Sequence, residues 1–217
     1  MALDETAKNG VTHEMVKFVL DTNYADLPGD AIEIAKRCIV DGTACMMAGS
    51  KEPAPDILRK LAFQVGGAEE ARTLGKDNMR VPLHVAAQIN GMSGHALDFD
   101  DTALSEEKDR SVLIHPTVQP LSACFAVGEH LNVSAEEFLT AFILGFEVQV
   151  KIAEAINADH FTGGRGFHTS GTIGIFGATI AAGKLFGLDY KQMSNAIGMA
   201  STMSAGVGAN HGTMSKP

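Results

Sequence analysis

One short stretch, residues 95–102, concentrates side chains that can move protons or bind cations. It reads His-Ala-Leu-Asp-Phe-Asp-Asp-Thr, so an imidazole, three carboxylates and a hydroxyl fall within eight residues. Carboxylates this close repel one another unless cations, hydrogen bonds or helix N-termini offset the repulsion. The residue types fit an acid–base or substrate-orienting role, a solvated turn with a helix N-cap, or Mg²⁺ binding by Asp98, Asp100 and Asp101.

Two histidines stand where helices should begin. His115 precedes Pro116, so its backbone should be extended and a helix should start after it. His168 stands in a Gly-rich loop, residues 163–172, whose amides and helix dipole would favour an anion. Imidazole has a pKa of about 6.5, so both histidines can donate and accept protons. His211, in a Gly-rich tail, is a weaker candidate, and the remaining histidines are expected at surface or packing positions: His13, His84, His130 and His160.

The spacing of apolar residues predicts that helices position these groups. Helical periodicity occurs around residues 16–20, 31–39, 57–65, 83–87, 118–132, 138–152, 172–186 and 196–200. Capping boxes are expected at Asp30 with Glu33, Ser134 with Glu137, and Asp189 with Gln192. Segment 172–186 is apolar nearly all round and should be a central, buried helix. Segments 73–79 and 201–217 should be connectors or loops. No alternating strand run exceeds four residues, so we expect an all-α, bundle-like fold.

Composition excludes several classes of protein. The chain has 217 residues, 45 % of them hydrophobic, which suffices for a sizeable core. A net charge of −9 without a basic cluster argues against a nucleic-acid partner and mildly against anionic membranes. The N-terminus shows no secretory signal, and the longest apolar stretch is too short to span a membrane. We expect a cytoplasmic protein whose three cysteines are free, buried thiols: Cys38, Cys45 and Cys124.

Four strings in this order resemble the MmgE/PrpD family. They are residues 94–102 (GHALDFDDT), 115–116 (HP), 166–172 (GFHTSGT) and 212–217 (GTMSKP). The family includes 2-methylcitrate dehydratases, cis-aconitate decarboxylases and iminodisuccinate epimerases. The resemblance implies that residues 1–217 form one helical domain, like the family's first domain. The family's second, α+β domain would then be absent, and the chain would be truncated or split at the Lys-Pro motif.

The resemblance also implies a set of site residues. Expected catalytic residues are Asp98, Thr102, His115, His168 and Lys216, and expected substrate-binding residues are His95, Gly166, Thr169 and Ser170. Such groups can stabilise negative charge beside a carboxylate and move a proton. These reactions need no electron-sink cofactor, and neither a Rossmann nor a P-loop fingerprint is present, so we expect no cofactor and no bound metal.

The leading hypothesis is therefore a cofactor-independent lyase or isomerase acting on a small polycarboxylate, as a homodimer. The main alternative is a catalytically silent helical fragment or interaction domain. A third possibility is Mg²⁺-dependent isoprenoid chemistry at the aspartate cluster, but the chain has no Trp and only 6 % aromatic residues to line a carbocation site.

Overall fold

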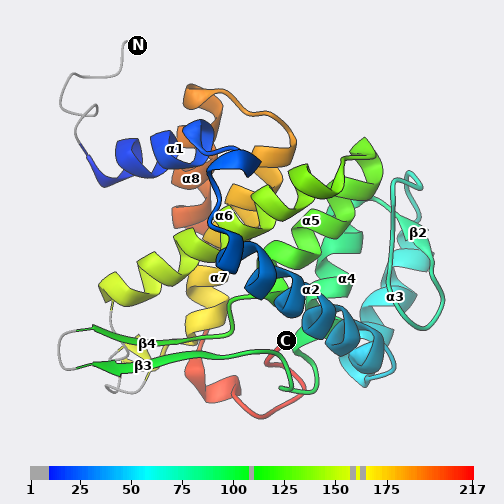
Figure 1. Cartoon of the computed structure of the whole chain (residues 1–217). Helices are drawn as coiled ribbons and strands as arrows, with labels where there is room; N and C mark the ends of the chain where they lie inside the picture. The colour runs from blue at the N-terminus through cyan, green and yellow to red at the C-terminus, as the bar shows by residue number, and fades with distance from the viewer. Residues whose placement is uncertain (1–9, 108–109, 157–159, 162–164) are drawn as a thin grey trace.

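The computed structural model describes residues 10–107, 110–156, 160–161 and 165–217. Over these ranges the chain forms eight α-helices and two small antiparallel sheets (Figure 1). A mostly helical fold is therefore confirmed. The helices are α1 (Val11–Asp21), α2 (Gly29–Gly49), α3 (Pro53–Val65), α4 (Leu83–His95), α5 (Val118–Leu131), α6 (Ala135–Ile156), α7 (Thr169–Leu185) and α8 (Tyr190–Met203). Two short 3₁₀ turns, η2 (Tyr24–Asp26) and η4 (Gly208–Asn210), complete them.

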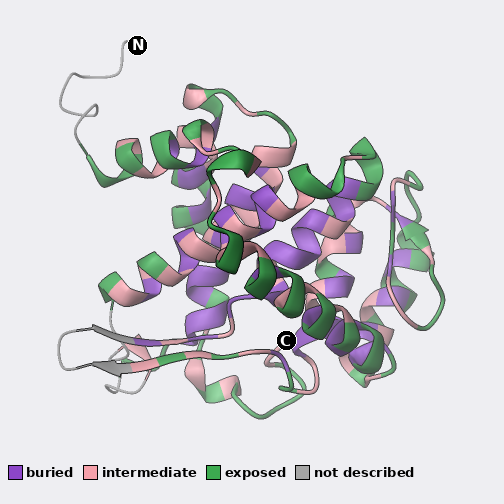
Figure 2. Ribbon diagram, in the orientation of Figure 1, coloured by how far each residue is buried: buried purple, intermediate pink, exposed green. Residues whose placement is uncertain are grey.

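The centre of the molecule is α7, as its all-round apolar sequence predicts. The most extensive helix contacts join α7 to α6 and to α5. Figure 2 shows buried positions gathered along these three helices. Glycines allow α6 and α7 to approach closely, because a Cβ on Gly145 would lie only 2.6 Å from the carbonyl oxygen of Gly177. Among the described helices, none is long and apolar enough to cross a membrane.

Two of the three predicted capping boxes are confirmed. The amide of Ser134 donates to the Glu137 carboxylate at 2.7 Å, and the amide of Glu137 donates to Ser134 Oγ. At the start of α8 the corresponding bonds join Asp189 and Gln192. Each box depends only on neighbours three residues apart, so the sequence is sufficient to predict it.

The capping box predicted at Asp30 and Glu33 is wrong. Helix α2 begins earlier, at Gly29, with Pro28 as its N-cap. Asp30 therefore lies inside the first turn, where its carboxylate accepts from the amide of Ala31 at 2.9 Å. The Glu33 side chain pairs with Lys36 instead of returning to the helix start.

Helix α3 forms where periodicity predicts it, but the apolar residues that predicted it face solvent. Ile57, Leu61 and Val65 are all more than half exposed. The buried charged residue of α3 is Arg59, whose guanidinium donates to the carbonyl of Ser50 at 2.7 Å and of Leu74 at 3.0 Å. Arg59 thereby joins the end of α2 to the connector after α3. That connector includes strands β1 (Ala71–Arg72) and β2 (Arg80–Val81), which pair on either side of segment 73–79.

An antiparallel hairpin links α4 to α5, and the sequence analysis did not predict it. Strand β3 (Ala103–Glu107) pairs with β4 (Arg110–Ile114), with Ala103 opposite Ile114. Val112 and Ile114 pack on Ala153 of α6 and Ile173 of α7. This packing stabilises a sheet of only two strands, which would be marginal alone. The hairpin brings the two chain segments that flank it, residues 98–102 and 115–117, to one place.

Candidate active site

The turn after α4 shapes the site. Helix α4 ends at His95, and Asp98 follows in the left-handed conformation, with φ of 58°. Asp is one of the few residues with a side chain that adopts this conformation routinely. The chain reverses there and carries Asp100 back beneath the helix end, where Asp100 is buried.

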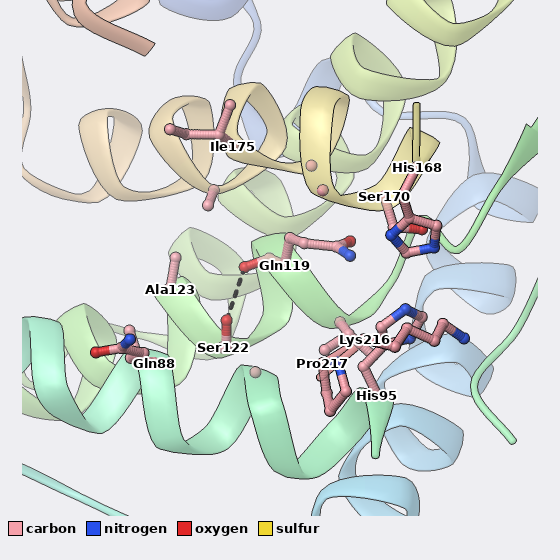
Figure 3. Close-up of a pocket in the computed structure, with 16 residues that line it drawn as sticks. Gln88, His95, Gln119, Ser122, Ala123, His168, Ser170, Ile175, Lys216 and Pro217 are labelled. Carbon is pink, nitrogen blue, oxygen red and sulfur yellow. Dashed lines mark hydrogen bonds between the residues drawn. The ribbon is translucent and has the colours of Figure 1, made fainter. Parts of the chain in front are cut away.

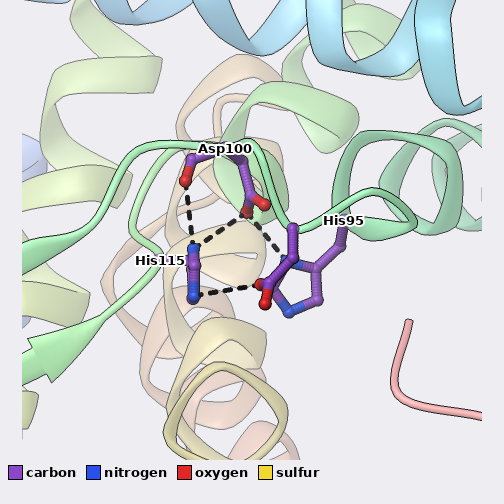
Figure 4. A group of neighbouring side chains, drawn as sticks. His95, Asp100 and His115 are labelled. Carbon is purple, nitrogen blue, oxygen red and sulfur yellow. Dashed lines mark hydrogen bonds and ion pairs between the residues drawn. The ribbon is translucent and has the colours of Figure 1, made fainter. Parts of the chain in front are cut away.

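Asp100 is the centre of a histidine–carboxylate cluster (Figure 4). His95 Nδ1 lies 2.8 Å from Asp100 Oδ2. His115 Nδ1 lies 3.2 Å from the main-chain oxygen of Asp100 and 3.4 Å from its Oδ2. Burial alone would raise the pKa of Asp100, but the hydrogen bonds and charges of His115 and His95 outweigh it and hold this pKa well below its usual range. The same pairing raises the pKa of His115, against the opposing effect of burial.

Asp98 lies next to a second set of basic groups. Its carboxylate is in contact with the ammonium of Lys216, which comes from the last residues of the chain. His115 Nε2 lies 3.6 Å from Asp98 Oδ1, and His211 Nε2 lies 4.0 Å from Oδ2. Burial would raise the pKa of Asp98, but Lys216 and then His115 and His95 lower it overall.

His168 is the N-cap residue of α7 and is nearly buried. Its ring centroid lies 5.7 Å from that of His95 and 6.1 Å from that of His211. Burial, together with the nearby His95 and Lys216, lowers the pKa of His168 to about 4. His168 is therefore neutral near pH 7 and suited to accept a hydrogen bond rather than to act as a cation.

The other predicted site residues differ in their distance from this cluster. Thr102 is at its exposed edge, with Oγ1 3.5 Å from His115 Nδ1. Ser170 Oγ accepts from the amide of His115 at 3.3 Å and belongs to the site. Thr169 lines a separate small cavity with His115 and His168. Gly166 is exposed, and its carbonyl accepts from the amide of Gly208 at 2.7 Å, so it orders the tail rather than the site.

A cavity of about 360 Å³ opens from the cluster between α4, α5 and α7 (Figure 3). Its polar end is formed by His95, His168, Ser170 and Lys216. Its far end is mostly apolar, with small side chains and one larger aliphatic one: Ala87, Ala123, Ala178 and Ile175. The volume suits a small organic acid.

Four residues of the cluster could hold a metal ion, namely His95, Asp98, Asp100 and His115, whose ligand atoms lie within 4.8 Å of one another. The arrangement of the acidic groups does not favour this role. The Asp98 carboxylate already pairs with Lys216, and Asp100 Oδ2 already accepts from His95. Asp101, the third residue of the metal hypothesis, turns away and accepts from Thr117 Oγ1 at 2.8 Å.

Sequence reasoning missed two members of the cluster. Asp100 was one of three aspartates whose role stayed open between acid–base chemistry, a solvated turn and Mg²⁺ binding, and it was not among the expected catalytic residues; His211 was a weaker candidate in a Gly-rich tail. The signal for Asp100 was its position five residues after His95, but that spacing becomes informative only when the turn is known. His211 had no local signal, since its neighbours in the site come from other segments.

Together, these observations define a helical domain with a histidine–carboxylate cluster beside a cavity. The model of the MmgE/PrpD N-terminal domain matches residues 13–217, so the chain belongs to the MmgE/PrpD family. A cis-aconitate decarboxylase of Aspergillus terreus is 30 % identical over 216 residues, which is 98 % of this chain and 43 % of that protein. The human cis-aconitate decarboxylase is 25 % identical over 211 residues, 95 % of this chain and 42 % of that protein. The chain thus spans less than half the length of these relatives.

Proposed function

We propose that this chain supplies the acid–base half of a cofactor-independent lyase or isomerase that acts on a small polycarboxylate. The observation that carries the proposal is the convergence of Lys216, His95 and His168 at the polar end of one cavity, beside the Asp98–Asp100–His115 cluster. Because the chain covers only part of its relatives, the activity is proposed for the whole protein that contains this domain.

The charges of the cluster suit a reaction that builds negative charge next to a carboxylate. The Lys216 ammonium and a protonated His115 supply two positive charges close together. Positioned cations stabilise a developing carbanion or enolate in the transition state. Asp98 and Asp100 balance these cations in the absence of an anionic ligand, so that binding a polycarboxylate would redistribute existing ion pairs.

The relatives make cis-aconitate the first substrate to test. In its decarboxylation, the bond to one carboxyl carbon breaks and CO₂ leaves. The electron pair remains on the carbon skeleton, and one proton is taken up to give an unsaturated dicarboxylate. Dehydration of 2-methylcitrate and epimerisation of iminodisuccinate are the other reactions to compare, since each also moves a proton next to a carboxylate.

The test is to incubate the full-length protein with cis-aconitate, 2-methylcitrate and iminodisuccinate separately and follow each by proton NMR. We expect turnover of one of them without an added metal or cofactor, and retention of that turnover in EDTA. If all three remain unchanged over hours at micromolar enzyme, the proposal is wrong.

A specific observation favours the alternative of an interaction domain. Apolar side chains on α2 and α3 face solvent, including Val40, Met47, Ile57 and Leu61. Such faces are covered in many proteins by another subunit or domain. We propose that this surface supports a homodimer, to be tested by sedimentation. A dimer that neither binds nor converts polycarboxylates would support the silent interaction domain.

A further inference from the structure

His95 has a ring environment that differs from those of His115 and His168. Its side chain is only 7 % exposed, and Nδ1 lies 2.8 Å from the fully buried carboxylate of Asp100. Its Nε2 is buried and has no hydrogen-bond partner within the described residues. The same ring lines the cavity that also touches His168 and Lys216 (Figure 3).

The hydrogen bonds of the cluster fix which nitrogen of His95 carries hydrogen. An ionised carboxylate only accepts, so the His95 nitrogen next to Asp100 must be the N–H donor. In a neutral ring the other nitrogen then carries a lone pair. The neutral His95 ring therefore has a basic Nε2 that is buried and left without a partner by the described residues, on a ring that lines the cavity.

His115 lies between two carboxylates, unlike His95. His115 Nδ1 faces a carbonyl oxygen and must also carry hydrogen, while its Nε2 faces Asp98. Between two carboxylates, His115 is the ring favoured to hold the positive charge.

His168 is less suited to exchange a proton. Burial first, and then the basic groups around the ring, disfavour its protonated form and lower its pKa. His115 is less suited for another reason, because it does not line the larger cavity. Only His95 combines access to the cavity, a buried carboxylate behind the ring and an unpaired Nε2.

We propose that His95 is the catalytic residue that exchanges a proton with the substrate carbon, and that Asp100 is its positioning residue. This assignment rests on the proposed function. In a decarboxylation, Nε2 of the neutral ring first takes a proton from water; the C–C bond to the departing CO₂ then breaks, and its electron pair takes that proton from Nε2, while the CO₂ combines with the remaining hydroxide as bicarbonate. In a dehydration or epimerisation, Nε2 accepts the C–H proton instead, and that proton leaves with the hydroxyl group as water or is replaced by a proton from solvent. In each case Asp100 stabilises the imidazolium that exists transiently.

The first test compares two substitutions on the same helix. His95→Asn places an amide N–H close to the position of Nδ1, so it can keep the bond to Asp100, but it offers no basic nitrogen to the cavity. We expect kcat in the full-length protein to fall about 10²–10⁴-fold, with KM changed less than about threefold. His84→Asn, at an exposed position of α4, is the matched control and should keep wild-type rates. A His95→Asn variant that keeps its rate within about fivefold overturns the proposal.

The second test reads the ring directly and does not depend on turnover. In the ¹⁵N-histidine-labelled protein at pH 7, we expect His95 to show a protonated Nδ1 and an unprotonated Nε2. Asp100→Asn should mix the two tautomers, because the amide can donate to Nδ1 as well as accept from it. A protonated Nε2 in the wild type would overturn the assignment.

The two tests separate this inference from the proposed function. If wild-type protein converts none of the polycarboxylates, the proposed function fails, and the ring spectrum still decides whether His95 presents a free base to the cavity. If wild-type protein is active and His95→Asn is folded by circular dichroism but equally active, only the role of His95 fails. His95→Gln, which keeps more of the ring's volume, provides a second variant if His95→Asn does not fold.

Discussion

The ammonium of Lys216 contacts the carboxylate of Asp98, a residue 118 positions earlier in the chain. The contact joins the last residues of the tail to the turn that follows α4. The Lys216 side chain is nearly buried, whereas that of Asp98 is about 42 % exposed. The tail therefore completes the site by burying a cation beside the histidines.

Removing the Lys216 charge should affect both catalysis and His168. In Lys216→Gln we expect turnover to fall about 10²–10³-fold, because a positioned group that stabilises transition-state charge is lost. We also expect the pKa of His168, measured by NMR titration, to rise, since burial depresses it first and the ammonium of Lys216 adds to that effect. Lys191→Gln, at an exposed position of α8, should change neither quantity. An unchanged pKa of His168 would show that Lys216 does not act on it.

Acid should destabilise the folded chain through His168. Its folded pKa of about 4 lies below the usual value of about 6.5, so between these pH values the unfolded chain binds a proton that the folded chain does not. The free energy of unfolding should therefore decrease as pH falls from about 6.5 towards 4, by at most about 3 kcal/mol from this group. Urea unfolding at pH 7 and pH 4.5 measures the loss.

In His168→Asn this loss should be smaller, because Asn does not titrate. His130→Asn, at an exposed position, should keep the wild-type loss. Equal losses in wild type and His168→Asn would contradict the buried, neutral state of His168.

Arg59 should matter for stability and not for chemistry. Arg59→Met keeps the length of the side chain but leaves the carbonyls of Ser50 and Leu74 without their donors. We expect the free energy of unfolding to fall by about 1–3 kcal/mol. Arg37→Met, exposed on α2, should stay within about 0.5 kcal/mol of wild type. If Arg59→Met leaves the free energy of unfolding unchanged, the cost of burying the guanidinium in the wild type equals the gain from its two hydrogen bonds.

Even one added methyl group where α6 crosses α7 should lower the free energy of unfolding. Gly145→Ala would place a Cβ against the backbone of Gly177, so the helices must separate. We expect a loss of about 1–3 kcal/mol in urea unfolding. Gly198→Ala, in α8 with open space around its Cβ position, should instead raise stability by up to about 1 kcal/mol. If Gly145→Ala and Gly198→Ala change the free energy of unfolding alike, the close backbone contact at Gly145 does not restrict which side chain fits there.

The helices could be predicted from the sequence because their signals are local. Ser134 with Glu137 and Asp189 with Gln192 set their own helix starts, and the all-round apolar sequence of α7 indicated its central position. The capping box at Asp30 was predicted wrongly because the helix already begins at Gly29, with Pro28 as its N-cap. The hairpin of β3 and β4 was missed because its strands are short and are stabilised by distant residues of α6 and α7.

The site was predictable only in part, for the same physical reason. The family resemblance indicated His115, His168, Asp98 and Lys216, and the structure brings these side chains together. It pointed to Asp98 and left Asp100 out, although Asp100 Oδ2 lies 2.8 Å from His95 Nδ1. Which carboxylate points at the histidines depends on how the turn folds. Gly166 was expected beside the substrate, but its loop pairs with the tail instead.

The left-handed backbone at Asp98 has a consequence for how this protein can change. A side chain in that conformation costs about 1–2 kcal/mol relative to the right-handed region, and glycine avoids the cost. Glycine at position 98 would also remove the carboxylate that pairs with the nearly buried ammonium of Lys216. A buried charge left without its partner costs more than the left-handed backbone does. Heat resistance and turnover should therefore favour the same residue at this position, so that Asp98→Gly melts lower than wild type and reacts more slowly.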